Sequence, residues 1–144
     1  MNKVKKHEFM LSQLSDCKDF AEQFFNWYPK KNCFAFSGEM GAGKTTIINS
    51  LLQHLGITDF QGSPTFAIVQ SYLIPTNENC YHIDAYRIDN KEEALAIGFD
   101  EIMNEEAYFF IEWPEKIESF LPDNTIWVYI RESESNKRMI QIEE

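Results

Sequence analysis

The chain has 144 residues, of which 44% are hydrophobic and 15% are aromatic, and this predicts one folded globular domain over residues 1–144. Its formal net charge of −10 argues against a chain that grips a nucleic-acid backbone by itself, although it is compatible with a basic protein partner. No apolar run is long enough to cross a membrane, and no signal-peptide core follows the basic start at residues 1–7, so we expect a cytoplasmic protein. The three cysteines are scattered, without metal-ligand spacing or a disulfide framework.

The first part of the chain predicts a short strand and an amphipathic helix. The strand is expected at residues 9–11, and the helix is expected to begin after an N-cap at Ser15 and to end before Pro29. Apolar side chains recur at helical spacing: Leu14, Cys17, Phe20, Ala21, Phe24, Phe25 and Tyr28. A one-sided stripe of this kind is typical of a helix that packs on a core, and we interpret it so in preference to a ligand site.

Residues 38–46, Gly-Glu-Met-Gly-Ala-Gly-Lys-Thr-Thr, fit the phosphate-binding loop pattern G-x-x-x-x-G-K-[ST]. The apolar run at residues 33–36 predicts a buried strand before this loop. Residues 47–55 predict a helix after it, and Gly56 closes that helix. Strand, glycine loop and helix are the context that the motif requires, so we predict a site for a nucleoside triphosphate.

The glycines, the lysine and the threonine of the loop each have a physical role. Gly38, Gly41 and Gly43 permit backbone angles that a Cβ would forbid, so that successive N–H groups can converge on phosphate oxygens. The positive end of the following helix dipole points to the same place. Lys44 can reach the β- and γ-phosphates, and the Thr45 hydroxyl can ligate Mg²⁺.

The middle of the chain predicts a hairpin of two antiparallel strands, at residues 67–74 and 80–86. In the second strand, alternation places three polar side chains on one face: His82, Asp84 and Tyr86. Such a face is either the wall of a site or a solvated surface, and the combination of imidazole, carboxylate and phenol favours the site.

The last part of the chain predicts helices at residues 91–97 and 99–103 and then a buried strand at residues 107–111. Glu112 stands at the carboxyl end of that strand. In a chain with a phosphate loop, a carboxylate in this position is the leading candidate for a Mg²⁺ contact. A helix is expected to begin at Pro114.

Two further strands complete the predicted elements. They are expected at residues 125–130, with Arg131 at the end, and at residues 138–142.

Four segments taken together resemble the TsaE family: residues 38–46, 63–66 (SPTF), 82–87 (HIDAYR) and 111–117 (IEWPEKI). The resemblance implies an α/β, P-loop NTPase-like three-layer sandwich with a mixed parallel and antiparallel sheet and few helices. It also implies a weak, Mg²⁺-dependent and partner-stimulated ATPase that is required to form threonylcarbamoyladenosine (t6A) on tRNA. Such a protein acts on the TsaD–TsaB complex and meets tRNA only through that complex.

The resemblance assigns roles to residues by position. The ATP phosphates are expected to meet the loop residues Glu39, Met40, Gly41, Ala42, Gly43, Lys44, Thr45 and Thr46. Met40 replaces a more usual leucine, which conserves volume. Further ATP contacts are expected from Ser12, in the segment that starts the first helix, and from Glu115 and Arg131.

The resemblance also suggests how the reaction is catalysed. Thr45 and Glu112 are expected to hold Mg²⁺, with Lys44, Asp84 and Glu112 as the catalytic set. Because Trp113 and not a second carboxylate follows Glu112, Asp84 is the best candidate to orient the attacking water. Asp84 could instead reach Mg²⁺ through water, and the sequence leaves open which of Asp84 and Glu112 touches the metal. Thr65 resembles a switch residue that senses the γ-phosphate. Support is expected from His82, Tyr86, Arg87 and Trp113.

Two alternatives stay open. A stand-alone small-molecule or nucleoside kinase shares the phosphate loop, but it usually has an arginine-rich lid, and this chain has three arginines, Arg87, Arg131 and Arg138, without a cluster. A nucleotide-dependent scaffold would hydrolyse ATP only incidentally. It would lose function with Lys44→Ala and keep it with Asp84→Ala.

Overall fold

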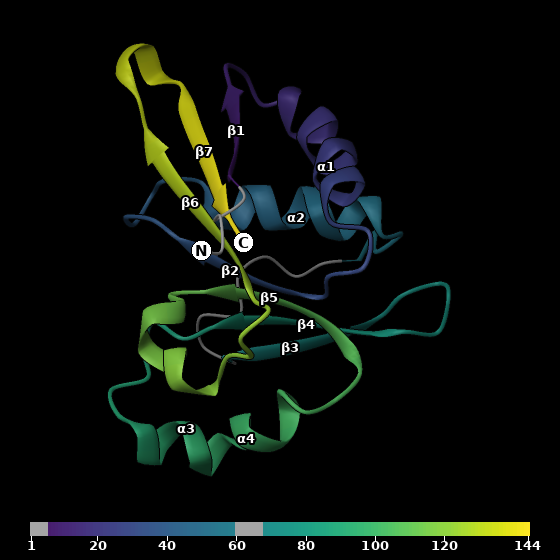
Figure 1. Cartoon of the computed structure of the whole chain (residues 1–144), viewed down its shortest axis with the longest axis vertical. Helices are drawn as coiled ribbons and strands as arrows, with labels where there is room; N and C mark the ends of the chain where they lie inside the picture. Colours follow the sequence, from purple (N-terminus) through teal and green to yellow (C-terminus); the bar gives the residue numbers. More distant parts are fainter. Residues whose placement is uncertain (1–5, 60–67) are drawn as a thin grey trace, which may run out of the picture.

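The computed structural model describes residues 6–59 and 68–144. In this part of the chain, seven strands form one mixed sheet in the order β1-β7-β6-β2-β5-β4-β3 (Figure 1). The strands are β1 (Lys6–Leu11), β2 (Cys33–Ser37), β3 (Val69–Leu73), β4 (Asn79–Asp84), β5 (Ala107–Glu112), β6 (Ile126–Glu132) and β7 (Arg138–Glu143). Strand β2 runs parallel to β5 and β6, and β5 runs parallel to β4. The outer pairs β3–β4, β6–β7 and β1–β7 are antiparallel, so the predicted hairpin is confirmed.

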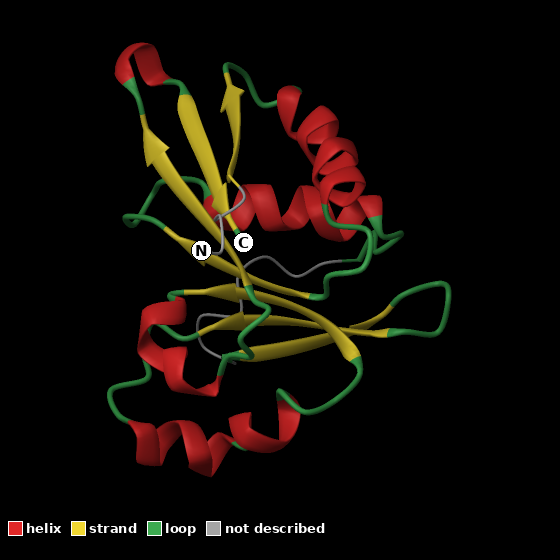
Figure 2. Cartoon of the chain, viewed as in Figure 1, coloured by secondary structure: helices red, strands yellow, loops and turns green. Residues whose placement is uncertain are grey.

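Helices cover both faces of the sheet (Figures 1 and 2). They are α1 (Asp16–Trp27), α2 (Lys44–His54), α3 (Lys91–Ile97), α4 (Phe99–Ile102) and the 3₁₀ segments η1 (Pro114–Phe120) and η2 (Glu134–Asn136). One buried cluster joins α1 and α2 to the sheet, and a second joins α3, α4 and η1 to its other face. The predicted three-layer arrangement with few helices is therefore confirmed. None of the helices in the described residues has the length and apolar character that a membrane crossing requires.

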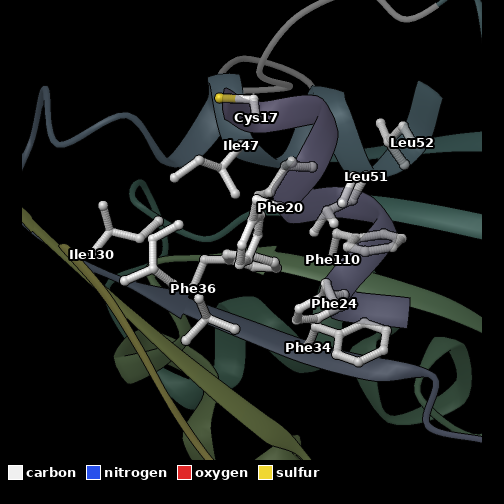
Figure 3. Close-up of a cluster of buried hydrophobic side chains, with 14 of the residues drawn as sticks. Cys17, Phe20, Phe24, Phe34, Phe36, Ile47, Leu51, Leu52, Phe110 and Ile130 are labelled. Atoms are coloured by element: carbon white, nitrogen blue, oxygen red, sulfur yellow. The ribbon is translucent and has the colours of Figure 1, made fainter. Parts of the chain in front are cut away.

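The core beneath α1 and α2 is built largely from aromatic rings (Figure 3). Phe24 of α1 lies edge-on to Phe34 of β2, with 4.8 Å between the ring centroids. Phe110 of β5 stacks on Phe34 from the neighbouring strand. All three side chains are fully buried, so the helical stripe predicted for this segment is core, as expected.

Leu14 is a correction to the predicted stripe, because its side chain is 74% exposed. The helix begins only at Asp16, so helical spacing does not govern the direction of Leu14. Ser15 makes no capping hydrogen bond through its side chain. Instead, the Asp16 carboxylate accepts hydrogen bonds from the backbone N–H groups of Ser12 and Gln13, which fixes the turn before the helix.

Tyr86 is a second correction. Strand β4 ends at Asp84, and Asp84 Oδ1 accepts a hydrogen bond from Tyr86 N at 3.0 Å. This side-chain bond turns the chain out of the strand, so Tyr86 does not continue the polar face and is 44% exposed. His82 and Asp84 are buried, and the polar face of β4 is not a solvated surface.

Candidate functional site

The phosphate loop connects β2 to α2 and has the backbone geometry that the motif predicts. Gly41 and Gly43 adopt positive φ angles of 83° and 101°, which a residue with a Cβ rarely takes. A Cβ on Gly38 would lie 2.6 Å from the carbonyl oxygen of Ile130, so this glycine lets the loop pass close to β6. The loop ends at Lys44, the first residue of an 11-residue helix whose N-terminus suits an anion.

Lys44 provides a buried positive charge beside the loop. Its side chain is 5% exposed, and Nζ donates a hydrogen bond of 2.5 Å to the carbonyl oxygen of Gly38. Nζ also lies 3.7 Å from the ring centroid of Trp113. Burial lowers the pKa of Lys44 from its ordinary value of 10.5, and the neighbouring carboxylates of Glu112, Glu115 and Asp84 oppose that change.

Two carboxylates meet the loop at the ends of parallel strands. The register of β4 and β5 pairs Asp84 with Glu112, the last residue of each strand, and both side chains are buried. Thr45 Oγ1 donates a hydrogen bond of 2.9 Å to Glu112 Oε1. The strands, the loop and α2 thus bring Lys44, Thr45 and both acidic residues to one place, as the sequence predicted.

The donor set fits Mg²⁺. A hydroxyl has one donor and two acceptor lone pairs, so Thr45 can donate to Glu112 and still present a lone pair to a cation. Mg²⁺ prefers oxygen ligands and usually takes few from protein, the rest being water and phosphate oxygens. Within residues 6–59 and 68–144, no group of three or more His, Cys, Asp and Glu side chains is arranged to hold a metal. Thr45 and Glu112 are protein ligands that a Mg²⁺ could use together with a phosphate, and Asp84 lines the same pocket.

A pocket of about 460 Å³ opens above these groups. Its lining includes loop residues, both acidic residues and two aromatic ones: Met40, Gly41, Gly43, Lys44, Thr45, Thr46, Asp84, Tyr86, Glu112 and Trp113. Trp113 adopts the left-handed conformation (φ 56°, ψ 50°), which is strained for a bulky residue. Its ring packs 5.1 Å from that of Tyr86 and beneath Lys44 Nζ. The sequence grouped Trp113 with the site but gave no sign of this backbone conformation.

A second pocket, of about 210 Å³, lies between the turn before α1 and the phosphate loop. Its lining includes three predicted nucleotide contacts, Ser12, Gly43 and Thr46. Arg138 lines it too. Arg138 Nε donates a hydrogen bond of 2.9 Å to the carbonyl oxygen of Ala42 in the loop. Sequence reasoning missed Arg138, because no motif surrounds it and only the β6–β7 pairing carries it to the loop.

Arg131, Glu115 and Arg87 are not among the residues that line the pocket of Lys44 and Asp84. Arg131 lines a different pocket, with Glu39 and Met40, so the structure does not bring it to Ser12. Glu115 accepts a close hydrogen bond from the Ser37 hydroxyl at the end of β2. Arg87 is exposed. Thr65, the predicted switch residue, lies outside the described residues.

His82 lies behind Glu112 in the same sheet. Its Nε2 atom is 2.7 Å from Glu112 Oε2, and its side chain is fully buried. The sequence placed His82 on the same strand face as Asp84 but did not predict this contact with Glu112.

Comparison with known proteins agrees with the fold. A family model described as threonylcarbamoyl adenosine biosynthesis protein TsaE matches residues 11–140. The tRNA threonylcarbamoyladenosine biosynthesis protein TsaE of Rickettsia typhi is 35% identical over 133 residues, which cover 92% of this chain and 91% of that protein. The protein of the same name from Borreliella burgdorferi is 37% identical over 110 residues, covering 76% of this chain and 79% of its own.

Structural similarity extends over almost the whole chain. The crystal structure of Bacillus subtilis YdiB superposes with a TM-score of 0.78 and 25% sequence identity, and the match covers 99% of this chain and 88% of that chain. The predicted P-loop NTPase-like α/β fold is therefore confirmed. Because the family model spans the phosphate loop and both acidic strand ends, and the sequence relatives agree with it, the chain belongs to the TsaE family.

Proposed function

We propose that this chain is an ATP-hydrolysing accessory subunit in the synthesis of threonylcarbamoyladenosine on tRNA. Its membership of the TsaE family and the names of its relatives support this role in tRNA modification. In the proposal the chain acts on the TsaD–TsaB complex in the cytoplasm and meets tRNA only through that complex. The net charge of −10 supports a protein partner over direct contact with the RNA backbone.

The observation that carries the proposal is the hydrogen bond from Thr45 to Glu112 beside the buried Lys44. In the proposed site, the loop backbone and the Lys44 ammonium hold the phosphates of ATP, while Thr45 and Glu112 hold Mg²⁺. A Mg²⁺ held by Thr45 and Glu112 would supply positive charge against the negative charge that develops on the phosphates. Because the loop is preformed and the lysine is poorly hydrated, little reorganisation is needed when phosphate charge develops.

Asp84 is proposed to orient the attacking water. It is paired with Glu112 in the strand register, lines the same pocket as Lys44 and Thr45, and accepts a hydrogen bond from Tyr86 N. Both carboxylates thus lie beside the pocket that would receive the phosphates. In the proposal the phosphate is transferred to water, turnover is slow, and the output is a change in partner binding.

Phosphate release from Mg²⁺·ATP, measured with and without purified TsaD and TsaB, tests the proposal. We expect slow hydrolysis that the partners stimulate, and a loss of about 100- to 1,000-fold in Lys44→Ala, because the phosphates lose their charged donor. Lys91→Ala is the matched control, since Lys91 is exposed at the start of α3. Unchanged turnover in Lys44→Ala would reject the site, and phosphate recovered on an added hydroxyl compound would favour a kinase.

A further inference from the structure

The two ring nitrogens of the buried histidine of β4 have different surroundings. Nε2 of His82 lies 2.7 Å from Glu112 Oε2. Nδ1 is buried too, and among the residues that the structure describes it finds no hydrogen-bond partner. This asymmetry favours the tautomer with the proton on Nε2. A proton on Nδ1 would be a buried donor without an acceptor, whereas a proton on Nε2 is donated to the carboxylate.

The position of His82 follows from the sheet. Strand β4 lies parallel to β5, and the register pairs His82 with Phe110 and Asp84 with Glu112. Side chains two residues apart share a strand face, so His82 is the diagonal neighbour of Glu112 across the pair. The histidine therefore approaches Glu112 from inside the sheet, while Thr45 approaches from the phosphate loop.

The two contacts together hold the carboxylate in one orientation. Thr45 donates to Oε1 and His82 donates to Oε2, so rotation of the carboxylate about its last side-chain bond would break both hydrogen bonds. The bond to His82 is buried and the bond to Thr45 is partly buried, so water is poorly placed to replace the histidine as a donor. The carboxylate is thereby preorganised toward the Thr45 hydroxyl.

We infer that His82 is a positioning residue: it donates from Nε2 to Glu112 Oε2 and fixes the carboxylate in the orientation in which it and Thr45 receive Mg²⁺ with the nucleotide. This inference rests on the proposed function, and it assigns His82 no contact with the metal or with ATP. Partners that orient a metal ligand typically change metal affinity by about 10- to 100-fold when they are removed.

The competing interpretation is a histidine that only stabilises the fold. Removal would then lower stability and leave the metal affinity of the folded protein unchanged. Two substitutions separate these roles. His82→Leu removes the donor and puts an apolar side chain of similar bulk in its place. His82→Gln retains an N–H donor at about the same distance from the backbone as Nε2. Cys80→Val is the matched control, because Cys80 lies on the same face of β4 and is fully buried, two residues from His82.

The test is the binding of Mn²⁺, as a spectroscopic substitute for Mg²⁺, measured by electron paramagnetic resonance with a non-hydrolysable ATP analogue. We expect His82→Leu to weaken Mn²⁺ binding about 10- to 100-fold, with analogue binding in EDTA unchanged. His82→Gln should recover most of the affinity, and Cys80→Val should match the wild type. Wild-type affinity in a folded His82→Leu protein, or no recovery in His82→Gln, would overturn the inference.

A second measurement serves if His82→Leu does not fold. Long-range ¹H–¹⁵N correlation spectra of the wild-type protein report which ring nitrogen of His82 carries the proton, and we expect Nε2. A proton on Nδ1 alone would overturn the inference, since Nε2 could then not donate to Glu112. Failure of the wild type to bind Mn²⁺ with the analogue would instead reject the proposed function, and the inference with it.

Discussion

Two regions on the same face of the sheet have opposite chemistry. The carboxyl ends of β2, β4 and β5 bury ionisable side chains around the phosphate loop: Lys44, His82, Asp84 and Glu112. The region beneath α1 buries rings without polar atoms: Phe20, Phe24, Phe34 and Phe110 (Figure 3). Burying charge costs free energy unless every group is paired, whereas burying rings is favourable. The aromatic region therefore supplies the stability that allows the charged region to stay buried.

The charged region also carries backbone strain. Trp113 has a left-handed conformation there, and burial lowers the pKa of Lys44. Such features are typical of sites at which structure serves function at the expense of stability. Substitutions in the two regions should thus separate into those that change stability and those that change turnover.

The largest expected effect is on stability, in the aromatic region. Phe24→Ala should lower the free energy of unfolding by about 3–5 kcal/mol, because it removes a fully buried ring that contacts Phe20 and Phe34. Urea unfolding measures the change, and Leu14→Ala, at an exposed position before the same helix, is the control with little expected effect. A tenfold loss of turnover in the folded Phe24→Ala protein would show that the two regions are not separable.

A smaller effect, on turnover and not on stability, is expected at the carboxyl ends of the strands. Asp84→Asn keeps the size of the side chain but removes the charge that orients water, so kcat should fall about 100-fold. The unfolding midpoint should change little, because Asn can still accept the hydrogen bond from Tyr86 N. Asp89→Asn, in the exposed turn that follows, is the control. Unimpaired turnover in Asp84→Asn would make hydrolysis independent of Asp84 and favour a nucleotide-dependent scaffold.

The smallest expected effect is the contribution of one buried thiol to the pH dependence of stability. Burial raises the pKa of Cys33 from 9.0 to about 11, although Thr125 partly opposes this by donating a hydrogen bond to the thiol. The unfolded chain loses the thiol proton near pH 9 while the folded chain keeps it, so stability falls as pH rises from 9 toward 11. The loss should be about 1 kcal/mol at pH 10. Cys33→Ala should remove this part of the slope between pH 8 and pH 10 in urea unfolding, and an unchanged slope would contradict it.

Local patterns predicted most of the fold. The strand, loop and helix around residues 33–55 are specified by neighbouring residues, and so is the helix ended by Gly98, which adopts a positive φ of 97°. Glu112 was identified from its place at the end of an apolar strand. These features depend on interactions within a few residues, which a single sequence displays.

Two kinds of contact escaped prediction. The first kind is local: Leu14 and Tyr86 were assigned from periodicity, but the Asp16 and Asp84 carboxylates accept hydrogen bonds from nearby backbone N–H groups and fix a turn at each place. The second kind joins distant parts of the chain. Arg138 reaches the phosphate loop only through pairing of β7 with β6. The contact of His82 with Glu112 depends likewise on the β4–β5 register. None of these pairings has a signal in the sequence near the residues concerned.

The central claim is that Thr45 and Glu112 act as one unit in Mg²⁺-dependent ATP hydrolysis. A double-mutant cycle with Thr45→Val, Glu112→Gln and the combined variant tests it through kcat/KM for Mg²⁺·ATP. We predict that the combined variant loses no more activity than the more damaged single variant, with a coupling energy of about 1–3 kcal/mol. Losses that multiply, as they do for independent residues, would contradict the account.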